Sequence, residues 1–307
     1  ALRESNREEI ILPDAVIAND EKAVLVLVIG ESARRDHFSL YGYDRLTNPR
    51  LSKVEGLKVY KANSSATYTT AGLKAMLEYK ESDDLYEILP NYLYRNGVDV
   101  IWRTSNWGQP PLHIGKYIEA GDLKSEYAGA DAGYDGILIE GLKEKIEESD
   151  TSKVLVILHT STSHGPSYNT RYPSEFEVFT PVCNTVEMSK CPKAQLINAY
   201  DNTIVYTDYL LDSIISDLKS LEGWRSCMMF VSDHGESLGE KNLYMHGVPI
   251  AIAPACQYEI PFIVWRSDGD GMYRDADLLS QHNVFHSVLD FLGVESPIYD
   301  DSMNIFN

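Results

Sequence analysis

Five short apolar runs constrain the fold of this chain more than any other feature of its sequence. Each run covers five to seven residues and ends in small or polar residues. Nearly continuous apolar character over this length is typical of strands buried on both faces, which occur in largely parallel sheets. The pattern therefore predicts an α/β fold with strands at Ala23–Ile29, Val98–Trp102, Lys153–His159, Cys227–Val231 and Pro261–Trp265.

Amphipathic segments between these runs predict helices. Apolar residues recur at helical spacing along Ala194–Leu221, the longest segment, and Leu85–Asn96 stops at Gly97, which is a common helix C-cap. Further helices are expected at Tyr134–Glu148 and Gln281–Leu292. No linker rich in Pro, Gly or Ser divides the chain, so we expect one domain over residues 21–307 after an extended lead-in over residues 1–20.

The charge balance excludes some classes of partner. Asp and Glu outnumber Lys and Arg, and the formal net charge is −19. Nucleic-acid binding needs a basic surface, and so does electrostatic attraction to an anionic membrane, so we expect no nucleic-acid partner. No apolar stretch has the length of a transmembrane helix, the segment from Arg3 to Glu9 is polar, and the first residue is not Met. We therefore expect a soluble fragment of a longer protein.

Two of the apolar runs end in residue types that bind metal ions. Glu31 follows Gly30 at the end of the first run, and Asp233 and His234 follow the fourth run just before Gly235. Adjacent strand residues point to opposite faces, so Asp233 and His234 can share an ion only if the chain turns, which Gly235 permits. A carboxylate oxygen and an imidazole nitrogen together suit zinc. The alternative is a surface loop with ordinary polar residues.

Two further histidines, His164 and His246, each precede a glycine near the predicted sheet rim. Their spacing leaves open whether they bind a second metal or are structural. His159 lies inside a predicted strand and is expected to be structural or to support the site. The context of the remaining histidines indicates no function; these are His37, His113, His282 and His286.

A hydroxyl-rich segment, Ser64–Leu77, runs into a plausible helix and supplies candidate nucleophiles. A hydroxyl at the start of a helix lies beside unpaired backbone N–H groups, which can hold a phosphoryl oxygen. A nearby zinc ion would lower the pKa of the hydroxyl and make it nucleophilic. Considered alone, the segment fits an ordinary helix N-cap better than a nucleophile.

Four cysteines allow two pairings. Cys183 and Cys191 flank a short polar loop, and their spacing fits either a disulfide made in an oxidising compartment or two unrelated thiols. Cys227 and Cys256 could pair only if two strand ends are neighbours.

Together these segments resemble the phosphoethanolamine transferases of the alkaline-phosphatase superfamily, the lipid A-modifying family linked to polymyxin resistance. The resemblance covers nearly the whole chain, with matching blocks in order at Gly30–Tyr43, Ser64–Leu77, His164–Tyr168, Phe179–Cys183, Leu196–Asn202, Ser232–Glu240 and His246–Gly247. It implies a three-layer α/β/α fold of the alkaline-phosphatase and sulfatase type.

The resemblance also implies a site. One tightly bound zinc ion would be held by Glu31, Thr69, Asp233 and His234, with Thr69 as the nucleophile. Aligning this segment with the family back from Met76 places the nucleophile at Thr69, and the neighbouring alternatives are Thr67 and Thr70. In the family, residues at the places of His164 and His246 handle a second zinc or the donor head group, Asn106 stands where a donor-binding residue is expected, and the pair Cys183 and Cys191 matches a disulfide.

By the same resemblance, the chain transfers phosphoethanolamine from phosphatidylethanolamine to lipid A, a core sugar or a surface protein through a phosphoethanolamine-threonine intermediate. It would be the catalytic domain at the periplasmic face of the inner membrane, following an absent N-terminal membrane domain. Alternatives are a phosphoglycerol transferase, a phosphatase- or sulfatase-like hydrolase of the same superfamily, and a catalytically inactive lipid- or glycan-binding domain. Sulfatases need Cys or Ser in a C/S-x-P-x-R context, which is absent.

The chain departs from the family pattern in two ways. Ser65 and Ala75 stand where many members brace the nucleophile loop with a disulfide, so we expect a loop that is either more mobile or held by packing. The segment around Asn106 also lacks the Lys that some relatives carry, which leaves donor contacts there undefined.

Overall fold

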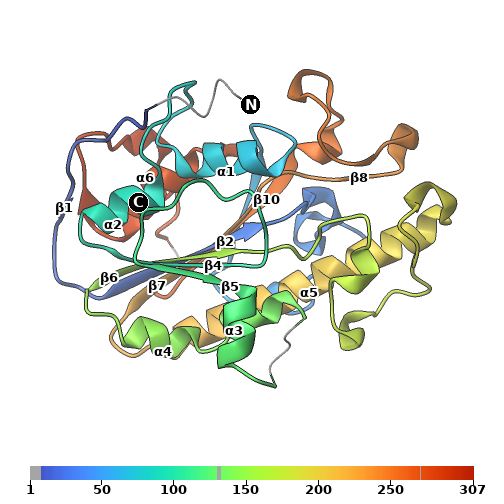
Figure 1. Ribbon diagram of the computed structural model, residues 1–307, viewed down its shortest axis with the longest axis horizontal. Helices are drawn as coiled ribbons and strands as arrows, with labels where there is room; N and C mark the ends of the chain where they lie inside the picture. Colours follow the sequence, from blue (N-terminus) through green and yellow to red (C-terminus); the bar gives the residue numbers. More distant parts are fainter. Residues whose placement is uncertain (1–7, 130–132, 270) are drawn as a thin grey trace.

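The core of the protein is an eight-stranded sheet, seen nearly edge-on in Figure 1. The structure is a computed structural model, and it describes residues 8–129, 133–269 and 271–307. The strand order is β11-β3-β10-β7-β2-β6-β4-β5. The strands of this sheet are β2 (Ala23–Gly30), β3 (Lys58–Asn63), β4 (Asp99–Thr104), β5 (Lys116–Glu119), β6 (Lys153–His159), β7 (Arg225–Ser232), β10 (Glu259–Arg266) and β11 (Leu279–Ser280).

All five predicted strands are present, and the sheet is largely parallel as predicted. Neighbouring strands from β7 to β5 run parallel, whereas β10 is antiparallel to both β7 and β3. The apolar pattern missed β3, β5 and β11, which lie toward the edges and carry polar residues or are short. A strand with less burial needs no continuous apolar run.

The central strand β2 is buried over its whole length because helices cover both faces of the sheet. Its alternate residues belong to two separate hydrophobic clusters, one on each face. One cluster contains α1 (Thr69–Leu77), α2 (Leu89–Arg95) and α6 (Asn283–Phe291), and the other contains α3 (Ala120–Glu126), α4 (Leu142–Glu147) and α5 (Lys193–Lys219). Figure 1 shows these two helical layers above and below the sheet, which confirms the three-layer arrangement.

The predicted helix at Tyr134–Glu148 is wrong as a single element. A 3₁₀ helix covers Asp135–Ile139, Gly141 has a left-handed backbone (φ 63°), and only α4 is α-helical. The apolar spacing is nevertheless real, because Ile137 and Ile146 are both buried in the same cluster. Similarly, the helix predicted from residue 85 begins at residue 89, because the backbone N–H of Ile10 pairs with the carbonyl of Leu85.

The segment before β2 passes the end of the sheet at which β2, β6 and β7 begin (Figure 1). Within it, β1 (Val16–Ile17) pairs antiparallel with β12 (Val294–Glu295) near the end of the chain. Residues 1–7 of the expected lead-in lie outside the described residues. Across the described ranges, no helix combines the length and apolar character needed to cross a membrane.

The cysteines are partly as expected. Cys183 and Cys191 form a disulfide with a Cα–Cα distance of 5.8 Å, as the resemblance predicts. Cys227 and Cys256 are free thiols, so that pairing does not form. Cys227 lies near the amino end of β7. Cys256 comes just before β10, which is antiparallel to β7 and therefore begins beside the carboxyl end of β7.

Candidate active site

The ends of β2 and β7 lie side by side and bring the two strand-end motifs together. Gly30 pairs with Ser232 as the last residues of their strands, so Glu31 and Asp233 leave the sheet next to each other. Ser32 has a left-handed backbone (φ 54°), and its N–H donates to Asp233 Oδ1 over 3.0 Å. This sharp turn, which is unfavourable for a residue other than glycine, holds Glu31 at the rim beside Asp233.

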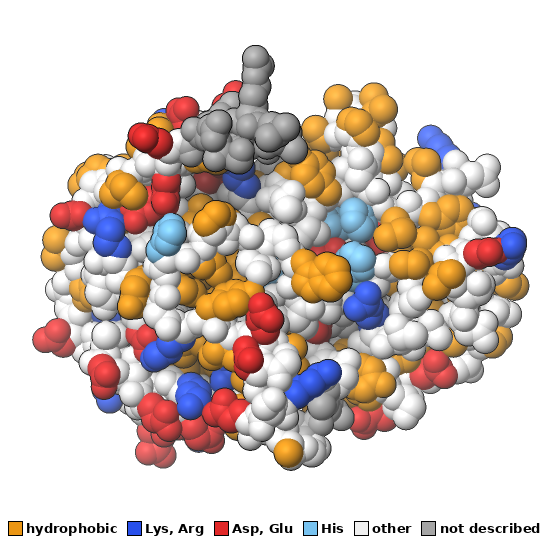
Figure 2. All heavy atoms as spheres, viewed as in Figure 1, with side chains coloured by type: hydrophobic (Ala, Val, Ile, Leu, Met, Phe, Trp, Pro, Cys, Tyr) orange, Lys and Arg blue, Asp and Glu red, His pale blue; other side chains and the backbone are white. Residues whose placement is uncertain are grey.

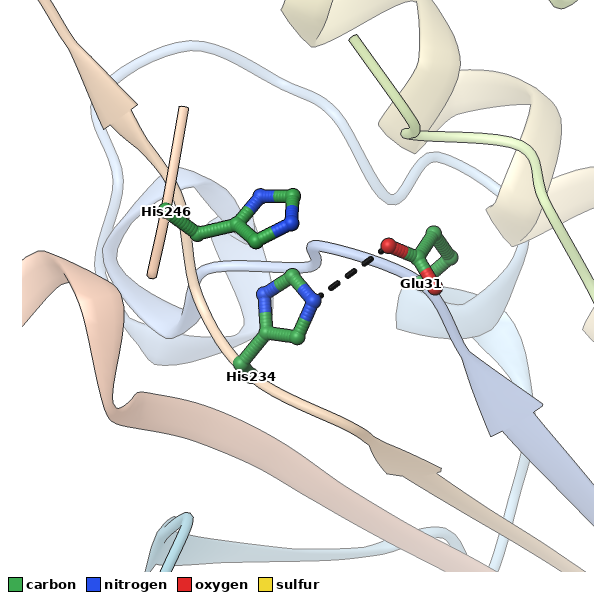
Figure 3. A group of neighbouring side chains, drawn as sticks. All are labelled: Glu31, His234 and His246. Carbon is green, nitrogen blue, oxygen red and sulfur yellow. Dashed lines mark ion pairs between the residues drawn. The ribbon is translucent and has the colours of Figure 1, made fainter. Parts of the chain in front are cut away.

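The side chains of Glu31, Asp233 and His234 converge on one point. His234 Nε2 lies 3.3 Å from Glu31 Oε1 and 3.4 Å from Asp233 Oδ2 (Figure 3 shows the first pair). His234 Nδ1 lies 2.7 Å from the Gly235 carbonyl oxygen, which can only accept a hydrogen bond. In the neutral ring Nδ1 therefore carries the proton, and Nε2 presents a lone pair toward both carboxylates.

Thr69 completes this group from the first position of α1. Its Oγ1 lies 3.2 Å from Glu31 Oε2 and 3.4 Å from His234 Nε2. The hydroxyl of Thr67, one of the alternatives, instead donates to the carbonyl of Val248 over 2.5 Å. Among the candidate threonines, Thr69 is therefore the one whose hydroxyl the structure places against the carboxylate and imidazole.

Two buried carboxylates at this point need a positive charge. Burial and the neighbouring Glu31 carboxylate hold the pKa of Asp233 well above its usual range. Burial also opposes ionisation of Glu31, but in the absence of a metal the contacts of Glu31 with the His234 ring and with Asp233 outweigh burial and hold the pKa of Glu31 well below its usual range. Asp233 Oδ2 has no hydrogen-bond partner among the described residues. An unsatisfied buried acceptor beside a lone pair and a second carboxylate fits a divalent cation.

His246 extends the group on the side of His234. Its ring lies 4.0 Å from the ring of His234, and Glu31, His234 and His246 offer ligand atoms that all lie within 4.8 Å of one another. Figure 3 shows His234 and His246 on one side of the point that Glu31 faces. The ring of His164 lies 6.1 Å from that of His246, so the two histidines lie one beyond the other next to the group.

A buried carboxylate and a phenol fix the orientation of His246, and sequence reasoning gave neither a role. His246 Nδ1 lies 2.8 Å from Glu236 Oε1, while Tyr168 donates its hydroxyl hydrogen to Glu236 Oε2 over 2.5 Å. Because the carboxylate accepts, Nδ1 of His246 donates and its Nε2 is left as an acceptor. The available signal was position, since Glu236 follows His234 by two residues and Tyr168 follows His164 by four.

Asn106, which was expected to bind the donor, contacts the carboxylate of Glu31. Its Nδ2 donates to Glu31 Oε2 over 2.8 Å and to the carbonyl of Thr160 over 2.7 Å. Its Oδ1 accepts from the N–H of Trp107 over 2.6 Å. These contacts hold Glu31 in place from the end of β4.

Hydrogen bonds and close packing hold the nucleophile loop, which has Ser65 and Ala75 where the resemblance would lead one to expect a disulfide. Gln281 Oε1 accepts from the N–H of Ser65, and Gln281 Nε2 donates to the carbonyls of Ser232 and Asp233. The start of α1 also packs directly on the Asp233 backbone at Gly72. Sequence reasoning missed Gln281, which lies more than two hundred residues from the loop and in no recognisable motif.

The other histidines have different surroundings. His159 is buried in β6, where burial lowers its pKa to about 4, and neither ring nitrogen has a hydrogen-bond partner within the described chain. The neutral ring packs edge-on against Trp102. The remaining four have partners elsewhere, with His37 on Asp201, His113 on Glu9, His282 on Glu78 and His286 on the Tyr79 carbonyl.

Comparison with known proteins identifies the class to which this fold and site belong. The model of the Sulfatase family matches residues 23–294, which makes the chain a member of that family and confirms the alkaline-phosphatase and sulfatase type of fold. The C-terminal periplasmic domain of phosphoethanolamine transferase EptC from Campylobacter jejuni is 36% identical, with a TM-score of 0.80, and the match covers 95% of this chain and 98% of that domain. Within the class, the chain belongs to the phosphoethanolamine transferases.

Other relatives are longer than this chain. Phosphoethanolamine transferase EptA from Helicobacter pylori is 42% identical over 299 residues, which is 94% of this chain and 57% of that protein. The integral membrane lipooligosaccharide phosphoethanolamine transferase A from Neisseria meningitidis is 31% identical with a TM-score of 0.88, and the match covers 99% of this chain and 62% of that one. The chain thus spans little more than half the length of the curated relatives that it matches.

Proposed function

We propose that this chain transfers phosphoethanolamine from phosphatidylethanolamine to a lipid A-type acceptor through a covalent intermediate on Thr69. The observation that carries the proposal is the position of Thr69 Oγ1, 3.2 Å from Glu31 and 3.4 Å from His234 at the start of α1. A hydroxyl so placed has an anion-binding helix start behind it and metal-binding side chains in front. The activities of the longer relatives support the same chemistry.

The residues present fit a zinc ion held by Glu31, Asp233, His234 and the hydroxyl of Thr69. The unsatisfied Asp233 Oδ2 and the unprotonated Nε2 of His234 are suitable donors for it. When bound, zinc would supply positive charge that lowers the pKa of the threonine hydroxyl and neutralises charge on the phosphoryl oxygens. His246, and His164 beyond it, would contact the donor head group or a second zinc.

The proposed reaction has two steps. Thr69 Oγ1 forms a bond to the phosphorus of the donor while the bond from phosphorus to the diacylglycerol oxygen breaks. The threonine proton is lost, and the departing oxygen gains a proton from a group at the rim. An acceptor phosphate or hydroxyl then attacks the phosphoethanolamine-threonine and restores the threonine hydroxyl.

Where no second zinc is bound, we assign the proton transfers to His246. Glu236 and Tyr168 fix its ring so that Nε2 is free to take and return a proton. The three residues thereby act as a unit, with Glu236 and Tyr168 positioning His246. The proposal places the chain at the periplasmic face of the inner membrane. There a membrane domain would anchor it, as in the integral membrane relative from Neisseria meningitidis.

The proposal is tested with Thr69→Ala and, as a matched control, Thr70→Ala in the next residue of the same helix. The 307-residue chain is incubated with phosphatidylethanolamine, and diacylglycerol release and the mass of the peptide carrying Thr69 are measured. We expect Thr69→Ala to abolish both diacylglycerol release and the phosphoethanolamine adduct, while Thr70→Ala retains both. Full release by Thr69→Ala, or an adduct on another residue, would overturn the assignment.

The same assay separates the alternatives. Release from phosphatidylglycerol but not from phosphatidylethanolamine would indicate a phosphoglycerol transferase. Continuous release of free phosphoethanolamine without an acceptor would indicate a hydrolase, and absence of any adduct with zinc-loaded protein would indicate a binding domain.

A further inference from the structure

The site is surrounded by four chain segments without Asp, Glu, Lys or Arg. They are residues 62–73, 104–115, 160–170 and 242–258, the last of which extends over 17 residues. In the whole chain, 24% of residues are charged and the net charge is −19. Charge is therefore depleted at this one rim of a strongly acidic protein.

These four segments are in contact around the site. The hydroxyl of Thr67 donates to the carbonyl of Val248, which joins the first segment to the last. A Cβ at Gly108 would lie 3.2 Å from the Thr70 side chain, so the second segment packs on the first. His164 of the third segment faces His246 of the fourth. We call this continuous surface the uncharged rim.

The uncharged rim exposes large apolar side chains to solvent. Trp107 is 85% exposed and Ile252 is 76% exposed, and Tyr68, Leu243 and Ile250 are also exposed. Figure 2 shows hydrophobic side chains on either side of two neighbouring histidines on this face of the molecule. Contiguous exposed apolar surface bounded by polar surface marks a contact site, whereas single exposed apolar residues do not.

The chemistry of the rim selects a phospholipid bilayer as the partner. Trp is the side chain that prefers the interface between lipid and water, and isoleucine gains from burial among acyl chains. Exposed carboxylates would repel the phosphate groups of a membrane surface, and the four segments of the uncharged rim have none, while Glu31 and Asp233 of the site beneath them are buried. The charged residues of the chain all lie outside these segments and give a net charge of −19, so the rest of the chain is on balance repelled by an anionic surface.

We propose that the uncharged rim is a bilayer-contact surface, with Trp107 and Ile252 entering the interfacial layer of the membrane. The proposal deepens the proposed function and rests on it for one consequence, that a phospholipid donor reaches Thr69 without leaving the bilayer. Contact itself is independent of that function, since it depends only on the exposed side chains.

Trp107 provides a built-in probe of this contact, because the other three tryptophans, Trp102, Trp224 and Trp265, are buried. The 307-residue chain is mixed with vesicles of equal parts phosphatidylethanolamine and phosphatidylcholine, with and without brominated acyl chains. We expect the tryptophan emission to shift to shorter wavelength and to be quenched by the brominated lipid. Trp107→Phe should remove both changes.

A matched pair of variants tests the location of the contact. Ile252→Asp places a charge in the rim, whereas Val16→Asp places the same charge at an exposed residue of β1, near the amino ends of the strands. We expect Ile252→Asp to weaken vesicle binding about tenfold, which corresponds to about 1.4 kcal/mol, and Val16→Asp to leave it unchanged. Equal loss in both variants would overturn the proposal.

Two further outcomes would also overturn it. One is failure of the unmodified chain to bind vesicles. The other is a sedimentation measurement in which the rim is covered by a second copy of the chain and Ile252→Asp dissociates the dimer without changing vesicle binding.

A donor comparison keeps this proposal separate from the proposed function. Ile252→Asp should lower transfer from a bilayer donor but not from a short-chain, water-soluble phosphatidylethanolamine. If neither donor supports transfer in the unmodified chain, the proposed function fails while the vesicle result still decides the contact.

Discussion

Gly72 offers the sharpest test of how the nucleophile is held in place. It lies in the first turn of α1, three residues after Thr69, where a Cβ would be 2.3 Å from the carbonyl oxygen of Asp233 and 3.0 Å from its carbonyl carbon. Ordinary contacts of a Cβ begin at 3.4 Å. Gly72→Ala must therefore move the start of α1 away from Asp233 by about 1 Å, because packed interiors leave no room to absorb the methyl group.

Two opposing effects set the magnitude. Alanine is the better helix former by about 1 kcal/mol, so propensity alone predicts a more stable protein. Overpacking costs about 1–3 kcal/mol, and a displacement of about 1 Å in a catalytic group costs about a hundredfold in rate. We expect Gly72→Ala to be less stable than the parent chain and to release diacylglycerol about a hundredfold more slowly, a barrier increase of about 2.7 kcal/mol.

Gly121→Ala is the matched control. Gly121 lies in the first turn of α3, and a Cβ there would meet no atom within 4 Å. This variant should keep full transfer and gain the stability that helix propensity predicts. Both variants are compared by thermal unfolding and by diacylglycerol release. If Gly72→Ala is as stable and as active as Gly121→Ala, the close contact between α1 and Asp233 does not position Thr69.

Two other predictions concern the groups around this contact. Because burial and Glu31 hold the pKa of Asp233 well above its usual range, a proton competes with zinc for this carboxylate over a wider pH range than for an ordinary aspartate, and zinc binding should tighten as pH rises. Titration calorimetry in buffers of different ionisation enthalpy would detect the proton released on zinc binding, and an affinity independent of pH would contradict the prediction. Gln281→Leu removes the hydrogen bonds that join Ser65 to the end of β7 and leaves buried polar groups unpaired. We expect the free energy of unfolding to fall by about 2 kcal/mol or more and the transfer rate to decrease. Denaturant unfolding unchanged from the parent chain would show that these hydrogen bonds do not support the loop.

Burial was predictable from the sequence, but backbone conformation was less so. The five apolar runs are strands in the structure, because a continuous apolar run of that length is typical of a strand buried on both faces. Ile137 and Ile146 satisfied a helical period and are indeed buried, yet the left-handed Gly141 breaks the helix between them. β3 carries Lys58 and Lys61 and is only partly buried, so it has no continuous apolar run and was not predicted as a strand.

The site was predictable where it depends on strand ends and not where it depends on packing. Glu31 and Asp233 each directly follow a buried strand, so their meeting at one rim follows from a parallel sheet. Thr69 lies at the start of α1, which packs on the Asp233 backbone at Gly72, and no local pattern encodes this packing between distant segments, so only the resemblance to a family selected Thr69. Gln281 was missed for the same reason, since it acts on residues far away in sequence.

The antiparallel course of β10 has a consequence for how such a protein can diversify. Because β10 is antiparallel to β7, the connection over residues 233–258 begins and ends on the same side of the sheet, at the carboxyl end of β7. A parallel successor would have required a crossover that also covers a face of the sheet. Most of this connection is fixed, because it carries Asp233, His234 and His246 and because Leu238 is buried in the same cluster as α5. Its exposed stretch at Ile250–Ile252 is bound by neither requirement, so this part of the connection can change in length between homologues without changing the strand order.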